Sequence, residues 1–153
     1  MKYFILTFIA GLVLTLNIQI ASAQSAKKIS GKETSLIIHL VKEANLPEAH
    51  STGDVYLLVT IGKTSYIAEL KSGKVIDQKN AVNSSGGFSG AYVEVSVNLL
   101  DKNKQETSQG AGQILKLNGN SWKKIALSEG DYQCRDVKSI SKSVLKALKV
   151  ECN

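Results

Sequence analysis

The clearest pattern in the chain is an alternation of apolar and polar residues near its middle. In the segment AYVEVSVNLL, residues 91–100, valines recur at every second position from Val93 to Val97, and polar residues separate them. A period of two residues is typical of a strand that buries one face. Two further pairs of apolar segments flank the short turns GK and NGN, and each pair predicts a hairpin. The predicted strands cover residues 54–61, 64–70, 91–100, 113–117 and 121–127.

Two other segments have the spacing of amphipathic helices. Residues 34–46 place apolar side chains three and four positions apart, and a capping box of Ser30 and Glu33 precedes them, while Pro47 supplies a stop. The same segment is rich in β-branched residues, so a strand is the alternative to the helix that we expect. Residues 139–150 carry apolar positions on one face and lysines on another, which predicts a C-terminal helix.

These elements predict the α+β fold class: an antiparallel sheet of four to five strands with an N-terminal and a C-terminal helix covering one face. The stretch NSSGGFSG, residues 83–90, contains no core-forming pattern and is expected to be a mobile loop. The polar residues 101–112 are expected to form an exposed connection. We expect residues 33–153 to be a single α+β domain that follows a flexible segment, residues 24–32.

The first 23 residues have the pattern of a secretory signal peptide. Lys2 precedes a long apolar run, and the small residues ASA stand ahead of Gln24. Residues 1–23 are therefore expected to be removed by cleavage after Ala23, and the mature protein to be exported, periplasmic or extracellular. The alternative is an uncleaved membrane anchor, although the apolar run is short for a span of about 20 residues. No later segment is apolar enough to predict a membrane span.

The chain is moderately basic, with a formal net charge of +6 that falls by one unit if Lys2 is removed. Positive charge favours anionic partners such as an anionic component of the cell envelope. Lys142, Lys146 and Lys149 recur on one face of the predicted C-terminal helix and are a candidate binding surface, although an ordinary solvated face is the simpler interpretation. Arg135 is the only arginine, which argues against a specialised nucleic-acid reader.

Cys134 and Cys152 are the only cysteines, and they flank the predicted C-terminal helix. An even cysteine count in an exported protein favours a disulfide. The segments on either side of the helix are long enough to fold back and bring the two residues together. Such a bond would tether the C-terminal helix to the sheet. Free thiols or a redox pair are the alternatives, but the spacing is not Cys-x-x-Cys.

The C-terminal segments GNSWKKIALSEGDYQC and SVLKALKVEC, together with SYIAEL further upstream, resemble a group of small exported bacterial domains of uncharacterised function. Those domains have a strand with Trp and basic residues, a short link, a Cys, a helix and a closing Cys. Many of them carry Pro where this chain has Ser141, so that helix start is not matched. The resemblance implies a compact α+β module with a disulfide and brings no catalytic residues.

The sequence contains few candidate catalytic or metal-binding residues. His39 lies within an apolar segment and is expected to be a partly buried structural residue, and His50 lies in a loop near Glu48. Neither histidine has further ligands at a spacing typical of zinc, so we predict no metal site and no cofactor. The chain has no Gly-x-Ser-x-Gly nucleophile motif and no phosphate-binding loop.

Tyrosines on the predicted strands offer a second candidate surface. If Tyr66 and Tyr92 shared an exposed face, they could form a binding platform, because tyrosine combines apolar area with a polar tip. We therefore expect an exported, non-enzymatic binding or interaction module, with an anionic envelope component or a protein as partner. The alternatives are a small exported hydrolase that uses His39 or His50, and an accessory protein of an envelope assembly.

Overall fold

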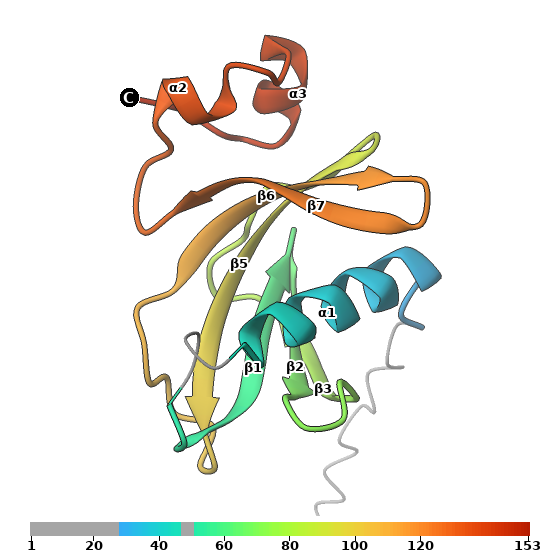
Figure 1. Cartoon of the computed structure of the whole chain (residues 1–153), viewed down its shortest axis with the longest axis vertical. Helices are drawn as coiled ribbons and strands as arrows, with labels where there is room; N and C mark the ends of the chain where they lie inside the picture. The colour runs from blue at the N-terminus through green and yellow to red at the C-terminus, as the bar shows by residue number, and fades with distance from the viewer. Residues whose placement is uncertain (1–27, 47–50) are drawn as a thin grey trace, which may run out of the picture.

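The computed structural model describes residues 28–46 and 51–153, so the predicted signal peptide, residues 1–23, and His50 lie outside the described residues. The described residues form a strongly twisted sheet, with α1 before the first strand and α2 and α3 after the last (Figure 1). The elements are α1 Gly31–Ala44, β1 Asp54–Ile61, β2 Thr64–Glu69, β3 Val75–Asn80, β4 Gly87–Ser89, β5 Tyr92–Asp101, β6 Ala111–Asn118, β7 Ser121–Ser128, α2 Cys134–Val137 and α3 Lys142–Ala147.

The sheet is antiparallel, as predicted, but in the part of the chain that the structure describes it has seven strands rather than four to five. Six strands follow the order β3-β2-β1-β5-β6-β7, and β4 pairs with β5. The two additional strands are β3 and β4. The sequence VIDQKN of β3 is mostly polar because this strand lies at the edge of the sheet with little covering it.

The Gly/Ser-rich segment expected to be a mobile loop instead contains β4. Phe88 pairs with Val93 in an antiparallel ladder, so this stretch is part of the sheet. Gly87 and Gly90, on either side of Phe88, have φ values of +73° and +58°, in the left-handed region that glycine adopts without strain. The glycines therefore shape a tight β4–β5 connection.

The segment that could have been helix or strand is the helix α1. Its capping box is formed as predicted: the Ser30 hydroxyl accepts a hydrogen bond from Glu33 N at 3.2 Å, and Glu33 Oε2 accepts one from Ser30 N at 2.8 Å. One face of α1 is buried against the sheet and forms the first core with residues of β1, β2 and β5. The buried residues of this face are Leu36, Ile37, Leu40 and Val41.

The two helical regions cover opposite faces of the sheet, and the prediction that both lie on one face is wrong. Neighbouring residues of a strand point to opposite sides. Leu115 belongs to the first core with α1, whereas Ile114 belongs to a second core with Val137, Ile140 and Leu148. Figure 1 shows α1 below the β6–β7 ribbon and α2 with α3 above it.

The C-terminal helix predicted for residues 139–150 is shorter than expected. The chain forms α2, then a turn, then α3, whose N-cap is Ser141. Cys134 and Cys152 form the predicted disulfide, with their Cα atoms 4.9 Å apart. Because these two residues bracket α2 and α3, the disulfide closes the whole C-terminal segment into one loop.

Candidate functional site

The three lysines singled out in the sequence come together around one open hollow beside α3, about 470 Å³ in volume. Lys142 and Lys146 stand four residues apart on the same side of the helix, and all three lysines are exposed. Lys149 has a φ of +55°, which turns the chain after the helix back toward the same hollow. We call this site the lysine hollow, and its lining residues are Lys142, Leu145, Lys146, Lys149, Val150 and Glu151.

The opposite side of this segment fixes the position of the lysine hollow. Leu148 is 1% exposed and packs in the second core with Val137 and Ile140. Cys152 forms a parallel bridge with Tyr132 in addition to its disulfide. The apolar side of the segment is therefore held on the sheet, which leaves the lysines directed away from it.

Beneath this segment lies a buried carboxyl group. Glu94 on β5 is 9% exposed, and its carboxylate accepts hydrogen bonds from the Tyr132 hydroxyl at 3.2 Å and from Gly86 N. Burial raises the pKa of Glu94 above its usual 4.5, against the lowering effect of these two hydrogen bonds. Burial and the neighbouring Glu94 also raise the pKa of Tyr132. This network connects the sheet, the β4 segment and the C-terminal segment.

The raised pKa of Glu94 makes stability depend on pH. The unfolded chain loses the proton first as the pH rises above 4.5, so the wild-type protein loses stability until the folded carboxyl has also ionised. We expect Glu94→Gln to lack this loss. Urea unfolding between about pH 4.5 and pH 7 measures this effect. The free energy of unfolding of Glu94→Gln, relative to that of the wild type, should increase as the pH rises. The exposed Glu129→Gln is the control, and a difference that does not change with pH would contradict the assignment.

The two tyrosines proposed for a binding platform do not share a face. Tyr66 is 1% exposed and lies in the first core, where its hydroxyl donates to Glu33 Oε1 at 2.9 Å. Burial, with Glu33 nearby, raises the pKa of Tyr66 to about 12. Tyr92 is half-buried against the second core, and Lys116 Nζ lies 5.3 Å from its ring centre. Tyr66 is therefore a core residue, and the expected platform does not form.

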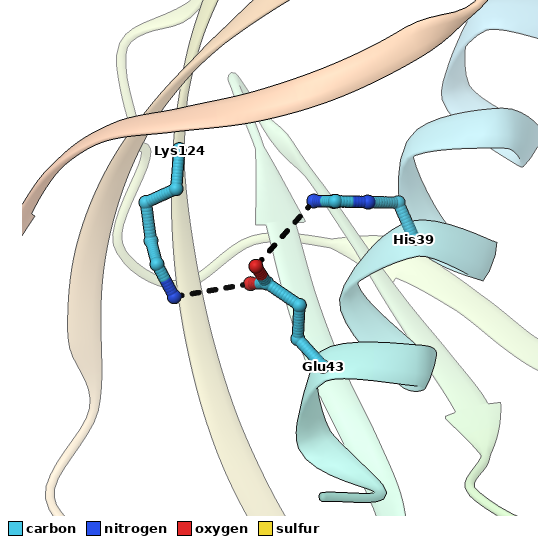
Figure 2. A network of polar contacts seen from close by, with 3 residues as sticks. All are labelled: His39, Glu43 and Lys124. Atoms are coloured by element: carbon cyan, nitrogen blue, oxygen red, sulfur yellow. Dashed lines mark hydrogen bonds and ion pairs between the residues drawn. The ribbon is translucent and has the colours of Figure 1, made fainter.

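His39 is partly buried on α1, as expected, and lies one turn before Glu43. Its Nε2 atom is buried without a hydrogen bond and is 3.6 Å from Glu43 Oε1, while Lys124 Nζ on β7 donates to Glu43 Oε2 at 3.1 Å. Figure 2 shows the Glu43 carboxylate between the two basic groups. This network ties α1 to β7.

A serine also lies one turn before His39, but the pair does not form a nucleophile and base. The Ser35 hydroxyl accepts a hydrogen bond from Trp122 Nε1 at 3.0 Å and donates to the Lys32 carbonyl at 2.9 Å. Its hydrogen bonds are therefore directed to groups other than the imidazole. The hydrolase alternative gains no support from this arrangement, and His50 lies outside the described residues.

Near the Glu43–Lys124 pair is a cleft of about 190 Å³ between α1 and the sheet. We call it the α1 cleft, and the residues that define it are Leu40, Glu43, Leu57, Val97, Gln113 and Lys124. None of these side chains belongs to a local motif, because they come from α1, β1, β5, β6 and β7. The one signal in the sequence is Gln113, a polar residue two positions before Leu115 and so on the same, buried face of β6.

Within residues 28–46 and 51–153, no group of three or more His, Cys, Asp or Glu residues could hold a metal ion. In the same part of the chain, no helix has the length and apolar character needed to cross a membrane. No family model matches the chain, and no curated protein or solved structure matches it significantly. The functional interpretation therefore depends on the geometry of these sites.

Proposed function

We propose that this protein is an exported, non-enzymatic binding module that attaches to an anionic component of the cell envelope through the lysine hollow. The observation that carries the proposal is the gathering of Lys142, Lys146 and Lys149 around one concave surface. The Cys134–Cys152 disulfide is compatible with an oxidising compartment outside the cytoplasm.

The chemistry of the hollow fits the headgroup region of an anionic membrane. Each lysine close to an anionic lipid surface contributes roughly 1 kcal/mol at physiological salt. Leu145 and Val150 provide apolar surface between the charged groups, and the lysine stems can lie along it while their ammonium groups contact phosphate. Glu151 is the one acidic residue that lines the hollow, so positive charge dominates there.

The test is binding to lipid vesicles by a variant that lacks the three charges. We expect Lys142→Gln, Lys146→Gln and Lys149→Gln together to weaken binding to phosphatidylglycerol-containing vesicles by about tenfold or more at low salt. Vesicle co-sedimentation measures the effect. Wild-type binding should fall as salt is added, because the Debye length shrinks from about 10 Å at 0.1 M to about 3 Å at 1 M.

A matched control separates the hollow from overall charge. The exposed residues Lys63, Lys71 and Lys74 lie in the β1–β2 and β2–β3 turns, and their replacement by Gln removes the same charge. This control should bind nearly as well as the wild type. Equal losses in both variants would indicate attraction by net charge alone, and equal binding to neutral phosphatidylcholine vesicles would also contradict the proposal.

A further inference from the structure

The α1 cleft contains a buried hydrogen-bond acceptor that the protein leaves unused. Gln113 lines the cleft and is 8% exposed, and its Oε1 atom has no hydrogen-bond partner. Gln113 pairs with Val95 and Leu127 in the sheet and lies on the face of β6 that is covered by α1. Buried polar atoms are nearly always paired. A rotation of the Gln113 side-chain amide that turns Oε1 toward the cleft would let this carbonyl accept from a donor outside the chain.

The cleft also carries one charge of each sign. Glu43 from α1 and Lys124 from β7 both line it, and their charged atoms are 3.1 Å apart. Both side chains are partly exposed, at 30% and 39%, so a ligand can reach them from solvent. A bound molecule with an ammonium and a carboxylate group could join this pair and leave every charge with a partner of opposite sign.

The rest of the lining is mainly apolar, with Asn98, Ser108 and Gln109 as its further polar residues. Leu40 on α1, Leu57 on β1, and Val97 and Leu99 on β5 line the cleft. A dry cavity of about 150 Å³ holds benzene. The α1 cleft, at about 190 Å³, therefore suits a ligand with a short aliphatic group and a few polar atoms.

From these contacts we infer that the α1 cleft is a second binding site, distinct from the lysine hollow, for a small zwitterion with an aliphatic side chain, the class of free aliphatic amino acids. The ligand's ammonium group donates to Gln113 Oε1 and Glu43. Its carboxylate accepts from Lys124, and its side chain packs against the apolar wall of Leu40, Leu57 and Val97.

Isothermal titration calorimetry with L-leucine tests this site on the protein with its disulfide intact. We expect a dissociation constant on the order of 1 mM or below, given the small number of ligand atoms. Two analogues each lack one charged group: isoamylamine has no carboxylate and 4-methylpentanoate has no ammonium. Both should bind about tenfold more weakly or worse, because each leaves one cleft charge without its new partner.

Two variants test whether leucine binds in the α1 cleft. Gln113→Leu removes the acceptor and should weaken leucine binding about tenfold. It should not lower the urea midpoint of unfolding, because it also removes an unpaired buried polar atom, so loss of binding with full stability excludes a folding defect. The control Gln105→Leu changes an exposed glutamine in the loop after β5 and should bind leucine like the wild type.

Three results would each overturn this inference. One is the absence of any leucine binding at about 10 mM, which would mean that the cleft holds only water. Another is equal affinity for leucine and both analogues, which would remove the requirement for a zwitterion. The third is unchanged leucine binding by Gln113→Leu, which would place leucine elsewhere on the protein.

Discussion

Loss of the Cys134–Cys152 disulfide is expected to lower the free energy of unfolding by about 3 kcal/mol, because the bond restricts the unfolded chain over a sequence separation of 18 residues. Apart from this bond, the C-terminal segment is held by the small second core and by backbone hydrogen bonds near its two ends. α2 and α3 are short, and between Cys134 and Cys152 the buried apolar residues are only Val137, Ile140 and Leu148. A loss of this size is a large part of the total stability of a small domain.

The double variant Cys134→Ser/Cys152→Ser and the dithiothreitol-reduced wild type should both show this loss in urea unfolding followed by Trp122 fluorescence. Hydrogen exchange gives the local effect. The amides of Leu145, Leu148 and Val150, which donate to carbonyls of their own segment, should exchange faster. Dithiothreitol should leave the double variant unchanged. If the reduced protein had the same urea midpoint of unfolding as the oxidised wild type, the bond would not be stabilising.

Gly86→Ala is expected to destabilise the protein by about 3 kcal/mol, because there is no room for a side chain where Gly86 meets the C-terminal segment. A Cβ atom added at Gly86 would overlap the carbonyl group of Leu148 and would also press on Glu94 at 3.1 Å. Relief of that overlap moves Gly86 N away from the buried Glu94 carboxylate, to which it donates a hydrogen bond. The substitution therefore combines steric overlap with the loss of a buried hydrogen bond.

Urea unfolding of Gly86→Ala beside Gly130→Ala measures this effect. Gly130 has open space around the position of a Cβ atom, and its φ is not in the left-handed region. Its replacement should change the free energy of unfolding by no more than about 0.5 kcal/mol. Similar stability for the two variants would show that the β4 segment moves away from Leu148 without penalty.

Local sequence patterns were enough to predict the elements that have a regular apolar spacing, a turn motif or a cap. β5 and the two hairpins follow from alternation and turn residues, and α1 follows from helical spacing with the Ser30–Glu33 box. The disulfide follows from two cysteines on either side of one segment. β3 was missed because an edge strand needs no apolar alternation, and β4 was missed because its glycines are typical of a loop.

The sites depend on which face of the sheet each helix covers, and a strand pattern does not contain that information. Tyr66 could be placed in the core only once α1 was known to lie over it. Gln113 and Lys124 come from the neighbouring strands β6 and β7, but Glu43 comes from α1 near the other end of the described chain, and the three meet only in the folded protein. Lys142, Lys146 and Lys149 could be singled out from the sequence because they lie within one short segment, but the sequence did not indicate the hollow that they line.

Because both faces of β6 are covered, the register of this strand is fixed by the packing on each face. Ile114 and Leu115 are neighbours in the sequence, yet each completes a different core. A register shift of one residue would exchange their environments. It would disrupt the core that α1 packs against and the core that the C-terminal segment packs against at the same time. One strand thus makes the two halves of the molecule depend on each other, although α1 and α3 lie on opposite sides of the sheet.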